Sequence, residues 1–399
     1  MRVLNNKEKT VPWGTLVGIR PVKRVVNMLS KGLSEEETIN ILKNEYEVSD
    51  KKIDLSLSIA KRELAIIETV PDNAVSLYID IPFCPSRCVY CSFASMPVSE
   101  MKDFIEPYLY ALYDELDTIR KIIDDLNLTI ISVYIGGGTP TSILSIELDN
   151  LLYKIENTFD LSNCSEFTIE AGRPDTITES KLDVMRNHGV DRISINPQSM
   201  NDKTLSVIGR KHSIEQIYKA YDLASTKGFK CINMDIIAGL PQETLEEFKN
   251  TVDKVIELNP ENITVHTMSI KRAARLNQNN DFDGLPVSNI VDQMVDYAHE
   301  KLAQNGYKPY YLYRQKNILG DLENTGFCRD GTEGVYNICM MEEIRTVISA
   351  GVGAVTKLVK GDRIERIFNV KDVREYLKRA EEMRERKKYI YEFYNNMEE

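Results

Sequence analysis

The stretch that decides the fold runs from residue 75 to residue 93 and reads VSLYIDIPFCPSRCVYCSF. Its first part, residues 75–81, is rich in β-branched and aromatic side chains and predicts a buried strand. Cys84, Cys88 and Cys91 follow directly in a C-x3-C-x2-C spacing. The sequence therefore predicts a strand that carries a compact loop of three thiols at its end.

Three thiolates on one short loop suit three corners of an iron–sulfur cubane. Structural zinc normally takes four ligands, and no fourth Cys or His lies nearby in the sequence. Ferredoxin-type clusters also take four cysteines. Three ligands leave one iron open, and the amino and carboxylate groups of S-adenosylmethionine suit that position. We therefore expect a [4Fe–4S] cluster on Cys84, Cys88 and Cys91, and a zinc loop completed by a distant Cys or His is the alternative.

Short β-rich runs alternate with amphipathic stretches along the middle of the chain. We expect strands at residues 75–81, 130–135, 166–169, 192–195, 232–236 and 263–268. Helices are expected between them, near residues 100–125, 145–158, 179–187, 213–227 and 243–257. Such a succession of βα units predicts an α/β fold with a parallel sheet, a partial (β/α)6 barrel. A flat doubly wound sheet is the competing arrangement.

Polar or glycine residues follow several of these strands: Gly-Gly-Gly-Thr at residues 136–139, then Glu170, Gln198, Asp235 and His266. The carboxyl ends of parallel strands meet at one rim, where α/β folds place their ligands. Glycines let the backbone approach a ligand closely, and a carboxylate such as Glu170 suits an ammonium or a ribose hydroxyl. The structural alternatives are a salt bridge between Glu170 and Arg173 and mutual satisfaction of the other polar groups.

The ends of the chain predict helices. Residues 1–70 contain a capping-box pattern at residues 34–37, and a charged helical tail is expected from residue 369. We expect three parts: a helical amino-terminal segment at 1–70, the partial barrel at 71–270, and a carboxy-terminal region at 271–399 that covers the substrate.

The composition narrows the class of protein. A net charge of −11 argues against nucleic acid as a partner, because phosphate binding needs a basic surface. The sequence contains no apolar run long enough to predict a membrane span. The chain has seven cysteines and lacks the pattern of a signal peptide, which favours metal ligation over disulfides and a cytoplasmic location.

Four stretches of the chain carry a known pattern: YIDIPFC at residues 78–84, GGGTPT at 136–141, IGR at 208–210 and DIIAGLP at 235–241. Together they resemble the oxygen-independent coproporphyrinogen III oxidase family of radical-SAM enzymes. Other stretches are similar to the HemZ-type branch, the coproporphyrinogen dehydrogenases. These are EAGRPD at 170–175, INPQS at 195–199, VHT at 265–267 and YYLYRQKN at 310–317. The resemblance covers about residues 12–385.

The resemblance implies an oxidoreductase of haem biosynthesis. A 5′-deoxyadenosyl radical would take hydrogen from propionate side chains of coproporphyrinogen III, carbon dioxide would leave, and protoporphyrinogen IX would form. Tyr78, Gly137 and Glu170 would contact the adenosylmethionine at the cluster, with Tyr78 and Glu170 as catalytic residues. Residues matching contacts to a second adenosylmethionine are Tyr90, Gly138, Thr139, Gln198, Arg210 and Asp235. A low-potential donor such as flavodoxin or ferredoxin would supply electrons.

The sequence departs from the better-studied members at two places. Phe93 stands where they carry a further Cys, and their S-x-G-x-Q segment reads SINPQ at residues 194–198. Both departures match the HemZ-type branch, and they leave open whether the chain binds one or two adenosylmethionine molecules.

A substrate with four propionates needs several cations in this acidic chain. We expect Lys271, Arg272 and Arg275 to form one basic cluster and Arg314 and Lys316 another, because the planar fork of arginine bonds both oxygens of a carboxylate. The rings of Tyr310, Tyr311 and Tyr313 would pack against pyrroles. The alternative is that these charges lie on a solvated face.

Two other functions use the same residues. One is a haem-binding chaperone that keeps the cluster without turnover, with His266 as the candidate ligand of haem iron. The other is a radical enzyme that modifies haem.

Overall fold

The computed structural model describes residues 12–271, 274 and 284–395. A single sheet runs through it in the order β13-β12-β11-β1-β4-β5-β6-β7-β8-β10-β9. Its centre consists of all six predicted strands, neighbours in chain order and parallel to one another: β1 (Ala74–Ile81), β4 (Thr129–Gly137), β5 (Glu166–Gly172), β6 (Arg192–Ile195), β7 (Cys231–Ala238) and β8 (Asn262–Thr267). The first and last strands of the order do not pair, so the sheet is an open, partial barrel, as predicted.

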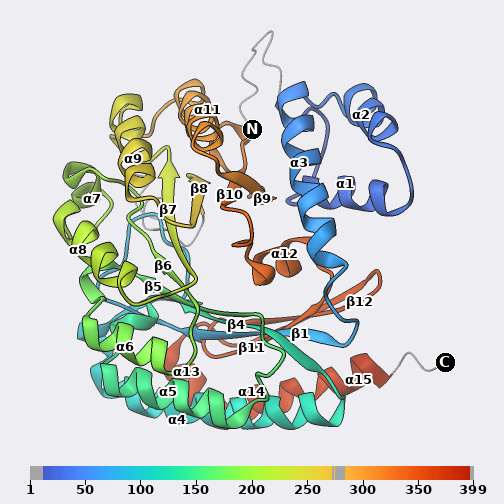
Figure 1. Cartoon of the computed structure of the whole chain (residues 1–399). Helices are drawn as coiled ribbons and strands as arrows, with labels where there is room; N and C mark the ends of the chain where they lie inside the picture. Colours follow the sequence, from blue (N-terminus) through green and yellow to red (C-terminus); the bar gives the residue numbers. More distant parts are fainter. Residues whose placement is uncertain (1–11, 272–273, 275–283, 396–399) are drawn as a thin grey trace, which may run out of the picture.

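Helices between these strands cover the outer face of the sheet (Figure 1). They are α4 (Val98–Asp125), α5 (Ser145–Thr158), α6 (Glu179–Asn187), α7 (Asp202–Val207), α8 (Ile214–Ser225) and α9 (Leu245–Leu258). In α5, Leu148, Leu151, Leu152 and Ile155 are all buried. This is the spacing of one helical face, and it explains why the amphipathic pattern located the helices.

The carboxy-terminal third extends the sheet at both edges. At one edge, β10 (Asn324–Cys328) lies antiparallel to β8, and β9 (Lys308–Tyr313) lies antiparallel to β10. At the other, β11 (Thr346–Ala350) lies parallel to β1, followed by β12 (Val355–Lys360) and β13 (Arg363–Phe368). The remaining elements are α11 (Ser288–Gln304), η3 (Leu319–Asp321), α12 (Val335–Glu342), α13 (Val373–Lys378), α14 (Ala380–Lys387) and α15 (Tyr389–Asn395).

The amino-terminal helices pack on the edge strand β9. They are α1 (Pro21–Ser30), α2 (Glu35–Asn44) and α3 (Asp50–Ile67), and Leu312 of β9 belongs to their hydrophobic cluster. The predicted capping box forms: Ser34 accepts from Glu37 N, and Glu37 accepts from Ser34 N. Figure 1 shows α12 on the concave side of the sheet, between the strands and α3. The boundaries predicted at residues 70 and 270 stay predictions.

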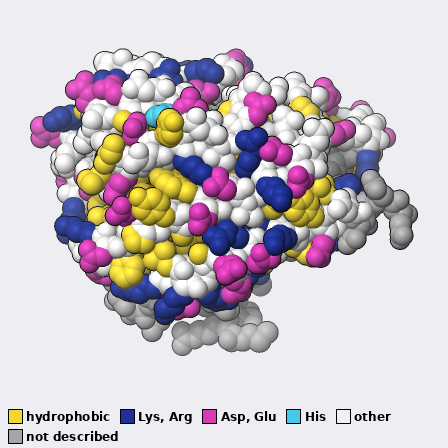
Figure 2. Space-filling model, turned by 90° about the horizontal axis from the view of Figure 1, so that it is seen from below, with side chains coloured by type: hydrophobic (Ala, Val, Ile, Leu, Met, Phe, Trp, Pro, Cys, Tyr) yellow, Lys and Arg dark blue, Asp and Glu magenta, His cyan; other side chains and the backbone are white. Residues whose placement is uncertain are grey.

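The outer face of α4 and α5 is partly apolar. Tyr110, Ile146 and Tyr153 are exposed there. Figure 2 views the molecule from below and shows hydrophobic side chains among charged ones on that face. Within the described part of the chain, none of the helices combines the length and the apolar character needed to cross a bilayer.

Candidate active site

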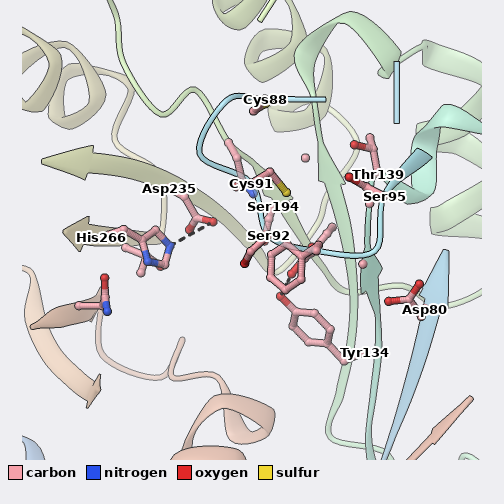
Figure 3. A pocket seen from close by; sticks show the side chains of 18 of the residues that line it. Asp80, Cys88, Cys91, Ser92, Ser95, Tyr134, Thr139, Ser194, Asp235 and His266 are labelled. Atoms are coloured by element: carbon pink, nitrogen blue, oxygen red, sulfur yellow. Dashed lines mark hydrogen bonds and ion pairs between the residues drawn. The ribbon is translucent and has the colours of Figure 1, made fainter. Parts of the chain in front are cut away.

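A pocket of about 590 Å³ lies at the carboxyl ends of the parallel strands and extends along their concave face. Most of the predicted site residues that the structure describes line it. These are Tyr78, Cys84, Cys88, Tyr90, Cys91, Gly137, Gly138, Thr139, Glu170, Gln198, Arg210, Asp235, Lys271 and Tyr311. Figure 3 shows several of them converging from different strands. Residues far apart in sequence therefore share one chamber.

The cysteine loop is anchored at both ends. Its start, β2 (Phe83–Cys84), pairs with β3 (Met96–Pro97), and Val89 N donates to Ile208 O at 3.1 Å. Gly138 packs against the start of the loop, because a Cβ on it would lie 2.6 Å from Phe83 O and 3.0 Å from Cys84 Sγ. A glycine at position 138 is thus required for the loop to sit against strand β4.

The three thiols fit the predicted cluster. None of them forms a disulfide, all three line the pocket, and Cys84 Sγ lies 3.4 Å from Thr139 Oγ1. Burial raises the pKa of Cys84 to about 11 and also raises that of Cys91, and the neighbouring thiols add to both shifts. Such thiols become stable thiolates by binding a cation, as a cluster iron would.

Among the described residues, no three Cys, His, Asp or Glu side chains are grouped as ligands of a single metal ion. Thiolates on three different irons of a cubane stand farther apart than ligands of one ion, so this finding concerns single-ion sites alone.

Asp80 is a pocket residue that the sequence reasoning missed. It accepts a hydrogen bond from Tyr78 Oη at 3.3 Å on Oδ2, while its buried Oδ1 has no partner. Gly137, at φ 107°, passes so close that a Cβ would lie 2.5 Å from Asp80 Oδ2. Burial raises the pKa of Asp80 well above its ordinary value. A charged residue inside an otherwise uncharged strand was the available signal.

Glu170 faces the same space from β5. Tyr134 Oη donates to Glu170 Oε1 at 2.6 Å. Burial raises the pKa of Glu170 to about 7, against the effect of this hydrogen bond. The rim salt bridge considered as an alternative does not form, because the guanidinium of Arg173 pairs with Asp175, Nε to Oδ1 at 3.1 Å. Within the described part of the chain Glu170 has no salt bridge, so its carboxylate can bind a cation or a hydroxyl from the pocket in addition to Tyr134.

Gln198, Arg210 and Asn196 form a second group of polar side chains. Their buried atoms Gln198 Oε1, Arg210 Nε and Asn196 Oδ1 have no hydrogen-bond partner. Buried polar atoms are nearly always paired, so three orphans at one wall indicate room for a polar ligand. The backbone of Gln198 has φ 66°, and its N–H donates to Asp235 O at 2.9 Å.

His266 lies between two protein partners. Its Nε2 is 3.6 Å from Asp235 Oδ2, and its Nδ1 is 3.4 Å from Tyr313 Oη (Figure 3 draws the first contact). Burial opposes ionisation of Asp235, but His266 and the amide of Asn233 hold the pKa of Asp235 below its ordinary value. Since both ring nitrogens face partners, haem iron could bind His266 only after one contact breaks.

The predicted basic clusters separate in the structure. Lys271 lines the pocket, whereas Arg272 and Arg275 lie outside the described residues. Arg314 and Lys316 do not line the pocket. The guanidinium of Arg314 donates to Leu16 O and Asp321 O, both at 3.1 Å, and lies 5.8 Å from the centre of the Trp13 ring. These contacts favour a structural role for Arg314, holding the amino-terminal segment.

Aromatic residues form one wall of the pocket. Tyr134 and Tyr336 stack with ring centres 4.3 Å apart, and Tyr78 stacks beside them at 6.1 and 6.3 Å. On another side of the pocket, strand β9 carries Tyr311 and Tyr313, whose parallel rings have their centres 6.4 Å apart. Tyr310 is buried and does not line the pocket, but Arg192 and Asn337, which do line it, donate to its hydroxyl.

Comparison with known proteins gives concordant results. Residues 78–255 match the model of the radical SAM superfamily. The chain is 41% identical to the oxygen-independent coproporphyrinogen-III oxidase-like protein HemZ of Bacillus subtilis, over 96% of this chain and 78% of that protein. It is 30% identical to the heme chaperone HemW of Lactococcus lactis, over 76% of this chain and 74% of that protein. The solved structure of Escherichia coli coproporphyrinogen III oxidase, HemN, is similar in fold: TM-score 0.63, 24% identity, over 80% of this chain and 72% of that one.

Proposed function

Because the chain belongs to the oxygen-independent coproporphyrinogen III oxidase family of radical-SAM proteins, we propose that it decarboxylates coproporphyrinogen III oxidatively to protoporphyrinogen IX. Each of the two propionates converted to vinyl would lose one hydrogen atom to the 5′-deoxyadenosyl radical, carbon dioxide, and one electron that passes to an external acceptor. The observation that carries the proposal is the single pocket that unites the three thiols, the glycine run and Glu170. Its lining offers thiols for a cluster, carboxylates for a sulfonium amino acid and a half-buried Lys271 for a propionate.

Cys84, Cys88 and Cys91 would hold the cluster. When bound, the cluster supplies the electron that splits S-adenosylmethionine into methionine and a 5′-deoxyadenosyl radical. Around it, Gly137 lets the ligand approach the backbone, and Tyr78 and Glu170 hold its polar groups.

Tyr90, Gly138, Thr139, Gln198, Arg210 and Asp235 are proposed as contacts of a second adenosylmethionine. The three orphaned polar atoms of Gln198, Arg210 and Asn196 support a polar ligand at this wall. Equilibrium dialysis with labelled S-adenosylmethionine distinguishes one bound molecule from two.

The substrate would enter beside Lys271. Burial lowers the pKa of this ammonium, and a propionate would offset that cost with a charge-assisted hydrogen bond. The parallel rings of Tyr311 and Tyr313 would exclude water from the reacting side chain. Arg272 and Arg275 are proposed to bind further propionates, and a flavodoxin or ferredoxin to deliver the electron.

The test is an anaerobic assay of the reconstituted protein with dithionite, S-adenosylmethionine and coproporphyrinogen III. We expect protoporphyrin after oxidation of the products, and none from Cys88→Ala. Cys164→Ala is the matched control, because Cys164 lies outside the pocket. Cleavage of S-adenosylmethionine with no change in the porphyrin would contradict the proposed substrate.

A haem chaperone is the second candidate, supported by the similarity to HemW. Stable binding of haem without decarboxylation would favour it over the proposed enzyme. His266→Ala would then weaken haem binding only if one of its two present contacts opens. A methylated or alkylated haem product would instead favour the haem-modifying enzyme.

A further inference from the structure

Arg173 is a buried cation that no part of the proposed reaction uses. Its side chain is 3% exposed. The residue lies just after strand β5, where the chain turns into η2 (Pro174–Thr176). Both nitrogens of one edge of the guanidinium are taken by Asp175: Nε to Oδ1 at 3.1 Å and Nη2 to Oδ2 at 3.2 Å. This bidentate pair fixes the plane of the guanidinium.

The third nitrogen, Nη1, points at the cysteine loop. It donates to Ser86 Oγ at 3.1 Å and to Ser86 O at 3.4 Å, and it lies 4.0 Å from Cys88 Sγ. Cys84 Sγ instead faces the hydroxyl of Thr139, whereas the charges of Arg87 and Lys271 act on Cys91. Arg173 thus ties the loop to β5 and places positive charge beside one thiol.

We propose that Arg173 is a positioning residue that raises the reduction potential of the cluster through the Cys88 thiolate. The inference rests on the proposed cluster, not on the identity of the substrate. Reduction adds one electron to a cluster bound by thiolates, so a nearby cation and a donor to sulfur stabilise the reduced form more than the oxidised form. The effect is strong in a buried site, where the charge is poorly screened.

Asp175 allows an electrostatic role of Arg173 to be separated from a purely structural one, because the two residues should shift the reduction potential in opposite directions. Its carboxylate partly cancels the charge of Arg173, and His212 Nδ1 also faces it, at 3.6 Å. Arg173→Gln removes the cation and should shift the potential to a more negative value. Asp175→Asn removes the anion and should shift it to a more positive value. Among the described residues, the charge of Arg210 also acts on Cys88, but Arg210 is proposed to contact a ligand, which makes it unsuitable for this test.

The experiment is a redox titration of the full chain, reconstituted anaerobically, in which the electron paramagnetic resonance signal of the reduced cluster is followed. Iron content is measured on every sample. Arg173→Lys, which keeps the charge and loses the fork, should fall between Arg173→Gln and wild type. Arg192→Gln is the control, because Arg192 is equally buried but donates to Thr332 O and the Tyr310 hydroxyl.

Opposite shifts in Arg173→Gln and Asp175→Asn, with little change in Arg192→Gln, support the inference. Wild-type potentials in Arg173→Gln and Asp175→Asn, at full iron content, overturn it and leave the proposed function intact. If Arg173→Gln fails to bind iron, Asp175→Asn and Arg173→Lys decide alone: potentials equal to wild type overturn the inference. A wild type that binds no iron overturns the proposed function and this inference together.

Discussion

The phenol of Tyr134 on β4 donates a 2.6 Å hydrogen bond to Glu170 on the neighbouring strand β5. The two strands are parallel, with Tyr134 opposite Thr168, so Glu170 lies two residues closer to the carboxyl end of the sheet than this pair. Burial raises the pKa of Glu170 to about 7, and the hydrogen bond acts in the opposite direction. A carboxyl that changes its protonation near neutral pH therefore lies on the wall of the pocket.

Binding of S-adenosylmethionine should weaken as the pH falls below about 7, because Glu170 is ionised only above its pKa and only the ionised form attracts a cation. Glu170→Gln should bind more weakly at pH 8, by a charge-assisted hydrogen bond of about 1.5–3 kcal/mol, and should lose this pH dependence. Calorimetry at pH 6 and 8 measures both. Tyr134→Phe is the matched variant: loss of its hydrogen bond should move the transition to higher pH. Parallel pH profiles in wild type and Glu170→Gln would contradict the assignment.

The same carboxyl should lower the stability of the ligand-free protein at high pH. A folded-state pKa raised from 4.5 to about 7 favours folding while Glu170 is protonated, and this contribution is lost as the pH rises through that interval. Glu170→Gln should therefore be more stable than wild type at pH 8, by at most about 3 kcal/mol, and equal to it near pH 4. Urea unfolding at both pH values measures this; a loss of stability at pH 8 would show a structural role instead.

The carboxy-terminal helices are held by a buried ion pair. Lys387 Nζ lies 3.2 Å from Glu115 Oε1, with the two side chains 0% and 1% exposed. Glu115 also accepts from Asn369 Nδ2 at 2.8 Å and from Gly351 N at 2.9 Å. Lys387→Met leaves a buried carboxylate without its cation and should cost about 3–5 kcal/mol of unfolding free energy.

The matched control for this pair is on the surface of the same helical tail. Lys388 and Glu385 are 60% and 57% exposed, so Lys388→Met should cost less than about 1 kcal/mol. Equal costs for the two lysine variants in urea unfolding would show that the buried pair is not what holds the tail.

Arg314 should act on the amino-terminal segment. It lies over Trp13, the single tryptophan of the chain, whose Nε1 donates to the buried Glu323 at 2.8 Å. Arg314→Ala should shift the emission of Trp13 to longer wavelength and make it more accessible to iodide, while S-adenosylmethionine is still cleaved. Unchanged Trp13 emission together with lost substrate binding would restore the substrate role predicted from the sequence.

The sequence predicted the centre of the fold well, because each central strand is a buried apolar run and each helix has one apolar face. Strand β9 was missed for a physical reason. Residues 308–313 are aromatic and basic, and they form a strand only because β10 pairs with them after a loop. A run of charges also does not reveal which side each one faces, so Lys271 and Arg314 looked equivalent in the sequence although only Lys271 lines the pocket.

The candidate site was predictable where its residues follow strands, since the ends of parallel strands meet at one rim. It was not predictable where a contact joins distant segments. Arg173 reaches Ser86 across 87 positions of sequence, and Tyr134 became part of the site only through its partner on the adjacent strand. Spacing along the chain carries no information on such contacts.

The central claim, that a 5′-deoxyadenosyl radical takes hydrogen from a propionate of coproporphyrinogen III, can be measured directly. The substrate is deuterated at the propionate carbons next to the ring, and the 5′-deoxyadenosine formed under anaerobic turnover is analysed by mass spectrometry. Deuterium should appear in 5′-deoxyadenosine in step with vinyl formation. Unlabelled 5′-deoxyadenosine, with the porphyrin unchanged, would contradict the account.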